Sequence, residues 1–491
     1  MYEKYLRFMN YIDIKKKITS IFIILMGISI SIYLLFEVLS TESSFISELM
    51  KYLGFFTALY SVFAPRGGLI IMLFWCGYLD FIKRLIVLTQ GYQFMDVIDI
   101  LKVAPYTFLG IIIGLISERI ITRKNFYFRE ILIFIFVNFI LGILFIKEYY
   151  YSKNAFLVLA TTANNYFYVF LIFVVPLAYK SIDEIVQYIR ISLFIFIPVS
   201  VYGIWQSNFG LNQFEIDYLL TGFSRSIQVL RDENPRPFST LNSPHAFSIM
   251  WTFAAASYYF MINSQQKRWL YALFLLCFIM GVFFSYTRGS YVALVLCLTG
   301  LWVFRKKYLT FIFYGFLILS FIFIVAYAKE LMDLFEKITF ALNAQNNTEE
   351  KLYRFSTVSD RFKSFENLKS SPLFWQPFGN FEITKISGIS ERDEFFTHDA
   401  LSSSLLKFGY IPISIILTIL TYILYLFHSK AWCVSRLEIK NFLILAISIV
   451  VTVIFASLGG DTIHVFPWNY FFWFYMSIFF YFWCNEGKIN I

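Results

Sequence analysis

Apolar runs of about 20 residues alternate with short polar stretches along most of the 491-residue chain. A run of that length crosses the hydrocarbon core of a bilayer as an α-helix, because each residue adds about 1.5 Å to a core about 30 Å thick. The short alternating segments of a β-barrel are absent from the sequence. The pattern therefore predicts an all-α polytopic membrane protein with about 12–14 transmembrane helices. The predicted spans are residues 19–39, 46–64, 67–88, 98–117, 127–147, 154–179, 186–206, 244–262, 269–286, 290–304, 308–328, 398–427, 438–459 and 461–483.

One region leaves the number of spans open. Between residues 65 and 96, the charged residues Asp80, Lys83 and Arg84 interrupt an apolar run. Charges are costly inside a bilayer, so one span there either crosses the membrane or is re-entrant or interfacial. The first run, 19–39, follows a basic N-terminal stretch without a convincing cleavage site, and we expect it to be a retained span rather than a signal peptide.

The positive-inside rule gives the predicted topology. Fourteen spans place both termini on one side of the membrane, and we assign that side to the cytoplasm because the basic loops fall there. Those loops are residues 119–129, 180–190, 267–268, 305–307 and 430–440.

Composition supports this class of protein and excludes others. Hydrophobic residues make up 59% of the chain and charged residues 15%, whereas soluble domains have about 25% charged residues. The net charge of +9 comes largely from the predicted cytoplasmic loops, so we expect no nucleic-acid partner. The cysteines form no CxxC pair, and we expect neither a disulfide framework nor a zinc site but small core residues. These cysteines are Cys76, Cys277, Cys297, Cys433 and Cys484.

Two predicted outer connections, 207–243 and 329–397, are much longer than ordinary loops, which favours a functional role. We divide the chain into transmembrane helices with an outer loop (1–328), a large extracytoplasmic loop with short amphipathic helices (329–397) and C-terminal transmembrane helices (398–491), together one integrated membrane domain. In the large loop, Arg361 falls in the first turn of a predicted helix, where it adds to the positive end of the helix dipole. The alternative is an arginine that lies on the lipid headgroups.

Three short stretches carry the candidate chemistry, and all lie on the outer side in this topology. They are Arg236-Pro-Phe-Ser-Thr-Leu-Asn-Ser-Pro-His245, Ser285-Tyr-Thr-Arg-Gly-Ser290 and Thr397-His-Asp399. Arg236, Arg288 and Arg361 come from three separate outer connections. Arginine suits diphosphate recognition because its planar fork forms paired, charge-assisted hydrogen bonds. Each arginine alone also fits a helix anchor, whereas three on one face favour an anionic ligand. Gly289 is expected to permit close backbone approach beside Arg288.

His398 is the candidate proton acceptor. Its ordinary pKa near 6.5 suits removal of a proton from a hydroxyl, although a single histidine at a helix start is more often structural. The neighbouring Asp399 supplies a carboxylate. His245, His464 and Asp461 lack metal-ligand spacing, so we expect no metal and no cofactor. The sequence contains no phosphate-binding loop, nucleophile elbow or dinucleotide fingerprint.

The order of these motifs resembles the bacterial O-antigen ligase and Wzy-type O-antigen and exopolysaccharide polymerase family over residues 236–409. Gly-Asn at 379–380 and Phe-Gly at 408–409 extend the likeness. The resemblance implies a GT-C-like architecture and an inverting, metal-independent glycosyltransferase that uses undecaprenyl-diphosphate-linked glycans on the periplasmic or outer face. It also implies matches to family positions at Arg288, Arg361 and His398, with looser matches at Arg236 and Asp461.

The chain departs from this family at one position. The family commonly has His-Asn where this chain has His398-Asp399. Either side chain therefore remains a candidate for the proton acceptor, and we favour His398. Residues expected to support the site are Ser239, Asn242, Tyr286 and Asp461.

The function expected from the motifs and the resemblance is that of a polysaccharide polymerase, which transfers a glycan from undecaprenyl diphosphate to a hydroxyl of a second lipid-linked repeat unit. The first alternative is an O-antigen ligase, whose acceptor is lipid A-core. The second is a transporter or flippase of lipid-linked glycans, which should carry charges deep inside its spans.

The expected location is the bacterial cytoplasmic membrane, with the active site on the outer face and both termini in the cytoplasm. The expected partners are membrane lipids, the undecaprenyl-diphosphate-linked oligosaccharide, and the chain-length regulator and flippase of the same pathway.

Overall fold

The computed structural model contains α-helices, short 3-10 helices and connecting segments, with no strand among the residues that it describes. The described residues are 44–122, 126–152, 162–163, 165–223, 236–264, 266–304, 377, 409–433, 437–457 and 466–485. The predicted spans 19–39 and 308–328, and nearly all of the predicted large loop, lie outside these residues.

The helices follow the predicted spans closely wherever the two overlap. The structure contains α2 (Phe45–Phe63), α3 (Pro65–Arg84), η1 (Leu85–Leu88), α4 (Phe94–Leu101), α5 (Val103–Ile121), α6 (Phe128–Ser152), η2 (Phe167–Phe170), α8 (Leu171–Ala178), α9 (Ile182–Phe209), α10 (Gln213–Leu220), α11 (Pro244–Phe247), α12 (Met250–Asn263), α13 (Arg268–Phe284), α14 (Arg288–Val303), α20 (Tyr410–Cys433), α21 (Leu437–Ala456) and α22 (Trp468–Cys484).

Several of these helices have the length and composition of membrane spans. Among the described residues, five segments qualify: Phe94–Ile121, Phe128–Ile146, Ile182–Phe209, Tyr410–Ser429 and Leu437–Ala456. Side chains on α6 such as Phe128, Ile135 and Phe139 are more than 60% exposed, as expected for a helix that faces lipid. An all-α fold with several such helices is that of a multi-pass membrane protein.

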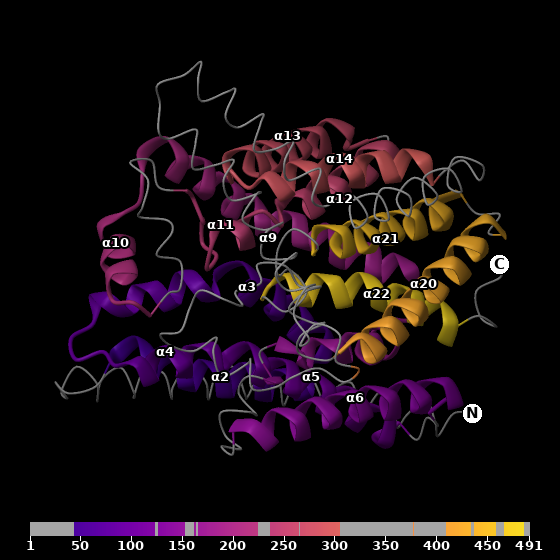
Figure 1. Cartoon of the computed structure of the whole chain (residues 1–491), viewed down its shortest axis with the longest axis horizontal. Helices are drawn as coiled ribbons and strands as arrows, with labels where there is room; N and C mark the ends of the chain where they lie inside the picture. The colour runs from indigo at the N-terminus through magenta and orange to yellow at the C-terminus, as the bar shows by residue number, and fades with distance from the viewer. Residues whose placement is uncertain are drawn as a thin grey trace, which may run out of the picture. The chain divides into compact units, whose positions relative to one another are not determined.

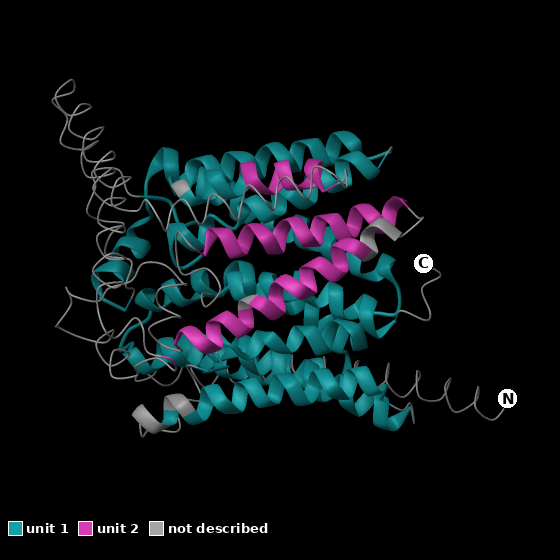
Figure 2. Ribbon diagram, turned by 45° about the vertical axis from the view of Figure 1, so that its right-hand side comes forward, with its two compact units in different colours: residues 1–294, 465–491 teal, residues 295–464 magenta. Residues whose placement is uncertain are grey.

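The chain divides into two compact units, coloured separately in Figure 2. Unit 1 comprises residues 1–294 and 465–491, and unit 2 comprises residues 295–464. In unit 2, α20 and α21 pack together, and the ring of Phe304 contacts that of His428. Both motifs that the structure describes lie in unit 1.

Close helix contacts and buried polar links hold unit 1 together. Figure 1 shows α2, α4 and α5 side by side. The Thr57 hydroxyl of α2 lies 2.9 Å from that of Thr107 on α5, and Trp75 Nε1 of α3 donates to Thr107 at 3.2 Å. Between α9 and α22, the hydroxyls of Tyr188 and Tyr470 lie 2.6 Å apart. Such links connect apolar helices at defined positions, because few other polar groups compete for these partners.

Three helices of unit 1 run in the same direction and end close together. Arg66 near the start of α3 pairs with Glu184 near the start of α9, and Tyr78 further along α3 donates to the Ile195 carbonyl. Along α13 and α9, the Ser200 hydroxyl likewise donates to the Cys277 carbonyl. The end of unit 1 where α3, α9 and α13 terminate is here called the motif end, because residues 236–243 and 285–290 lie there.

Candidate functional site

The first motif enters the motif end as an irregular segment, residues 236–240, and not as a helix. Arg236 is half-buried, whereas Phe238 and Ser239 are fully buried. Ser239 has φ 55°, in the left-handed region that costs a residue with a side chain roughly 1–3 kcal/mol. A buried segment in this conformation needs partners for its backbone polar groups.

Gln206, in the last turn of α9, supplies partners on the amide side of this segment. Its Oε1 accepts from the Ser239 amide at 2.6 Å and from the Phe238 amide at 3.2 Å. The Ser239 hydroxyl donates to the Val199 carbonyl of the same helix, and Thr240 donates to the Gly77 carbonyl at 2.5 Å. The Ser239 side chain thus supports the segment itself, because it is fully buried and bonded to α9.

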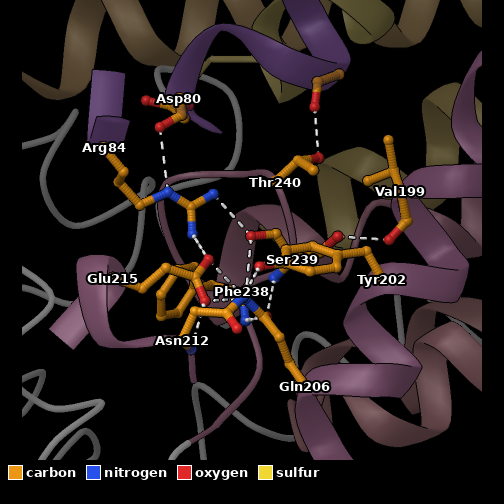
Figure 3. A network of polar contacts seen from close by, with 11 residues as sticks. Asp80, Arg84, Val199, Tyr202, Gln206, Asn212, Glu215, Phe238, Ser239 and Thr240 are labelled. Carbon is orange, nitrogen blue, oxygen red and sulfur yellow. Dashed lines mark hydrogen bonds and ion pairs between the residues drawn. The ribbon is translucent and has the colours of Figure 1, made fainter. Parts of the chain in front are cut away.

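Arg84, the last residue of α3, supplies the donor on the other side of the segment. Its Nη2 donates to the Ser239 carbonyl at 2.7 Å, and its Nη1 donates to Glu215 Oε1 at 2.8 Å (Figure 3). Its Nε donates to the Asp80 carbonyl at 3.1 Å, and its guanidinium lies 4.5 Å from the centroid of the Phe238 ring. Arg84 is 2% exposed, so its charge is balanced inside the protein and not by solvent.

Glu215 is the counterion of Arg84 and also caps the start of α10. Its side chain accepts from the backbone amide of Asn212 at 3.1 Å and so closes the capping box of that helix. The Gln206 amide nitrogen donates to both of its carboxylate oxygens, at 2.9 and 3.0 Å. One fully buried carboxylate therefore joins the ends of α3 and α9 to the start of α10.

A second ion pair completes the buried charges at the end of α3. Lys83 Nζ lies 2.5 Å from Asp80 Oδ1, and both residues are buried. Tyr218 of α10 lies beside Lys83, and burial raises the pKa of its phenol while the lysine charge opposes that shift. Two cations and two carboxylates thus balance, which explains how α3 continues through these charged positions to Arg84, where the 3-10 helix η1 begins.

The second motif forms the turn between α13 and α14. The hydroxyls of Ser285, Thr287 and Ser290 lie within 3.2 Å of one another and so stabilise the start of α14. Tyr286 has φ 50° and is 40% exposed. Its hydroxyl lies 3.1 Å from that of Ser207 on α9.

Consecutive residues of α9 therefore contact the two motifs. Gln206 binds the Ser239 backbone and Ser207 contacts Tyr286, so the segment with Arg236 and the turn with Arg288 meet at the end of one helix. Arg288 is the first residue of α14. The buried charges beside the segment with Arg236 are neutralised by one another.

Of the remaining predicted site residues, the structure describes some and leaves others outside the described residues. Asn242 is half-buried, and its Oδ1 accepts from the Ser243 hydroxyl at 3.0 Å. A Cβ at Gly289 would meet no atom of the described residues within 4 Å, so packing within that part of the chain does not require a glycine. The other predicted residues lie outside the described residues: Arg361, His398, Asp399 and Asp461.

The residues that join the site together are not among those that the sequence predicts. In the sequence Arg84 indicates only the interruption of a span, and Gln206 and Glu215 belong to none of the three motifs. Unpaired charges beside a bilayer-thick apolar run signal a buried partner elsewhere, but Glu215 is 131 positions away from Arg84. Among the described residues, no group of three or more His, Cys, Asp or Glu is arranged to hold a metal ion.

Comparison of the chain with protein-family models gave no match, and neither curated proteins nor solved structures matched it.

Proposed function

We propose that the chain is a polysaccharide polymerase that transfers a glycan from undecaprenyl diphosphate to a hydroxyl of a second lipid-linked repeat unit. The order of the sequence motifs motivates this proposal. The observation that carries it furthest is the contact of two consecutive α9 residues, Gln206 and Ser207, with the first and second motifs. That contact supports a shared anion site built from Arg236 and Arg288.

In this proposal the arginines act on the leaving group. As the anomeric bond breaks, negative charge develops on the diphosphate, and pre-placed guanidinium groups stabilise that charge. Arg288 and Arg361 hold the diphosphate and Arg236 assists. His398 accepts the proton of the attacking hydroxyl, a role typically worth about 10²–10⁴-fold in rate. Asp399 supports the histidine.

The positions of buried charges favour an enzyme over a transporter. A transporter needs ionisable groups along its path through the membrane. Among the described residues, the buried imidazole of His428 lies within α20. The buried carboxylate, lysine and arginine side chains lie near helix ends: Asp80, Lys83 and Arg84 in the last turns of α3, Glu130 in the first turn of α6 and Glu215 in the first turn of α10. Each has an opposite charge within 2.8 Å, which is typical of structural pairing.

A genetic experiment tests the proposed function against its rivals. In a strain that lacks the chain, a polymerase predicts single repeat units in place of long glycan, and the wild-type chain should restore the long form. Arg288→Lys should fail to restore it at matched protein levels, because a point charge does not reproduce a bidentate fork. Arg66→Lys, at the opposite end of α3, is the matched control and should restore it.

Other results would overturn the proposal in identifiable ways. Full-length glycan that stays on the lipid carrier in the deletion strain would indicate the ligase. Single repeats confined to the cytoplasmic face would indicate the transporter. If Arg288→Lys restores long glycan as well as the wild-type chain does, the guanidinium group of Arg288 is not required for the reaction.

A further inference from the structure

Side chains from two other elements bond the backbone of the segment that carries Arg236, and its own Ser239 and Thr240 hydroxyls donate to the Val199 and Gly77 carbonyls. The amides of Phe238 and Ser239 donate to Gln206, and the Ser239 carbonyl accepts from Arg84. The strained φ of 55° at Ser239 has no regular helix or strand around it to enforce it. Arg84 and Gln206 therefore help to set the conformation of this segment, together with the hydroxyls of Ser239 and Thr240.

Arg84 is unsuited to bind a substrate itself. Its three nitrogens donate to acceptors on α3, on α10 and in the motif segment, and the residue is 2% exposed. Its charge is matched by Glu215 at 2.8 Å. A ligand would have to displace protein contacts to reach this guanidinium, so any effect of Arg84 on activity has to pass through other residues.

We propose that Arg84 and Gln206 are positioning residues, which fix the backbone of residues 238–239 and thereby hold Arg236 beside the turn that carries Arg288. The expected effect on catalysis rests on the proposed function. The expected effect on the conformation of the segment is independent of that function, because the hydrogen bonds can be tested without substrate.

The first test is hydrogen–deuterium exchange of the full-length protein in lipid nanodiscs, without substrate. Arg84→Lys keeps the positive charge next to Glu215 but cannot reach the Ser239 carbonyl with the same fork. Exchange of the Phe238 and Ser239 amides should accelerate on the order of tenfold to a hundredfold, the value of a lost hydrogen bond to a charged group. Arg66→Lys changes an exposed pair on the same helix and should leave this exchange unchanged.

A second variant guards against misfolding of the first. Gln206→Met has nearly the same shape, leaves the Arg84–Glu215 pair in place and removes the acceptor of two backbone amides. It should also accelerate exchange at 236–240. Wild-type exchange there in both folded variants would overturn the positioning role.

The second test is a double-mutant cycle on the kinetics of polymerisation. Arg84→Lys should lower kcat/KM for the lipid-linked donor. The changes in kcat and in KM should stand in the same proportion to each other as they do in Arg236→Ala. The combined variant should be no worse than Arg236→Ala alone, because Arg84 acts through Arg236. A combined loss equal to the product of the single losses would show a separate structural effect and overturn the inference.

The two proposals fail in different ways. If Arg236→Ala retains wild-type kcat/KM, the proposed role of Arg236 in catalysis is wrong, while the exchange experiment still decides whether Arg84 and Gln206 hold the segment. If exchange is unchanged but Arg236→Ala is inactive, the positioning inference is wrong and the proposed function stands.

Discussion

Replacement of Glu215 by alanine should destabilise the protein more than any exposed charge substitution on the same helices. The carboxylate is fully buried, and its removal leaves the guanidinium of Arg84, 2% exposed, without the counterion that it contacts at 2.8 Å. Breaking a buried ion pair in this way costs about 3–5 kcal/mol. The Gln206 amide nitrogen also loses both carboxylate oxygens and keeps the Ser239 carbonyl at 3.5 Å, which places the expected loss towards the upper end of that range.

The chain supplies a matched control for this substitution. Arg66 and Glu184 also join α3 to α9, but their nitrogen–oxygen distance is 3.3 Å and their side chains are 45% and 33% exposed. An exposed pair of this kind contributes at most about 1 kcal/mol. Glu184→Ala also removes the acceptor of the Lys180 amide at 2.8 Å, so it should cost about 1 kcal/mol, well below Glu215→Ala. A double variant, Arg84→Met with Glu215→Met, should lose less than the sum of its single variants, because no charge is left unpaired.

Thermal unfolding in detergent measures these differences directly. A thiol-reactive dye reports the exposure of the buried cysteines, among them Cys76, which lies on α3 and is 1% exposed in the folded protein. At a fixed scan rate, Glu215→Ala should lower the apparent midpoint by on the order of 5 °C or more, and Glu184→Ala by at most about 2 °C. Equal shifts for the two variants would show that the buried network does not hold α3, α9 and α10 together, and the reasoning would be refuted.

Three further predictions follow from the packing and the motifs. A Cβ on Gly203 would overlap the ring of the fully buried Phe247, so Gly203→Ala should destabilise the protein by about 1–3 kcal/mol. Gly142→Ala, whose Cβ meets no described atom within 4 Å, should not, and equal melting midpoints would contradict this. The methyl group of Gly289→Ala meets no described atom, so the melting midpoint of this variant should match that of wild type. Turnover of the donor should fall about tenfold, because the methyl group would hinder a ligand that approaches the start of α14. Unchanged turnover would show that no ligand approaches there. His398→Ala should abolish polymer formation, while Asp399→Asn should retain substantial activity, because an aspartate with an ordinary pKa is a weak base at neutral pH. The reverse ranking of the two variants in a polymerisation assay would make Asp399 the proton acceptor.

Sequence patterns predicted the helices well because burial in lipid imposes a simple rule on residue type. The predicted span 186–206 lies within α9, Ile182–Phe209, and the span 269–286 nearly coincides with α13, Arg268–Phe284. Helix ends differ by a few residues because caps such as Ser181, whose hydroxyl accepts from the Glu184 amide, lie outside the apolar run.

The candidate site was only partly predictable, because its connections are long-range. The motifs pointed to Arg236 and Tyr286, which lie at the same end of unit 1. No local pattern links Arg84 to Glu215, since charge pairing across 131 positions depends on how the helices pack. The left-handed φ of Ser239 could not be predicted from the sequence either, because such conformations favour glycine and a serine does not indicate them.

The most direct test of the central claim uses the purified full-length protein in proteoliposomes, with a radiolabelled undecaprenyl-diphosphate-linked repeat unit as both donor and acceptor and with EDTA in the buffer. The proposed function predicts a ladder of glycans with increasing numbers of repeats, release of undecaprenyl diphosphate, and loss of both products in Arg288→Lys but not in Arg66→Lys. Repeat units that remain single and lipid-linked with folded wild-type protein, or a ladder that Arg288→Lys forms equally well, would contradict it.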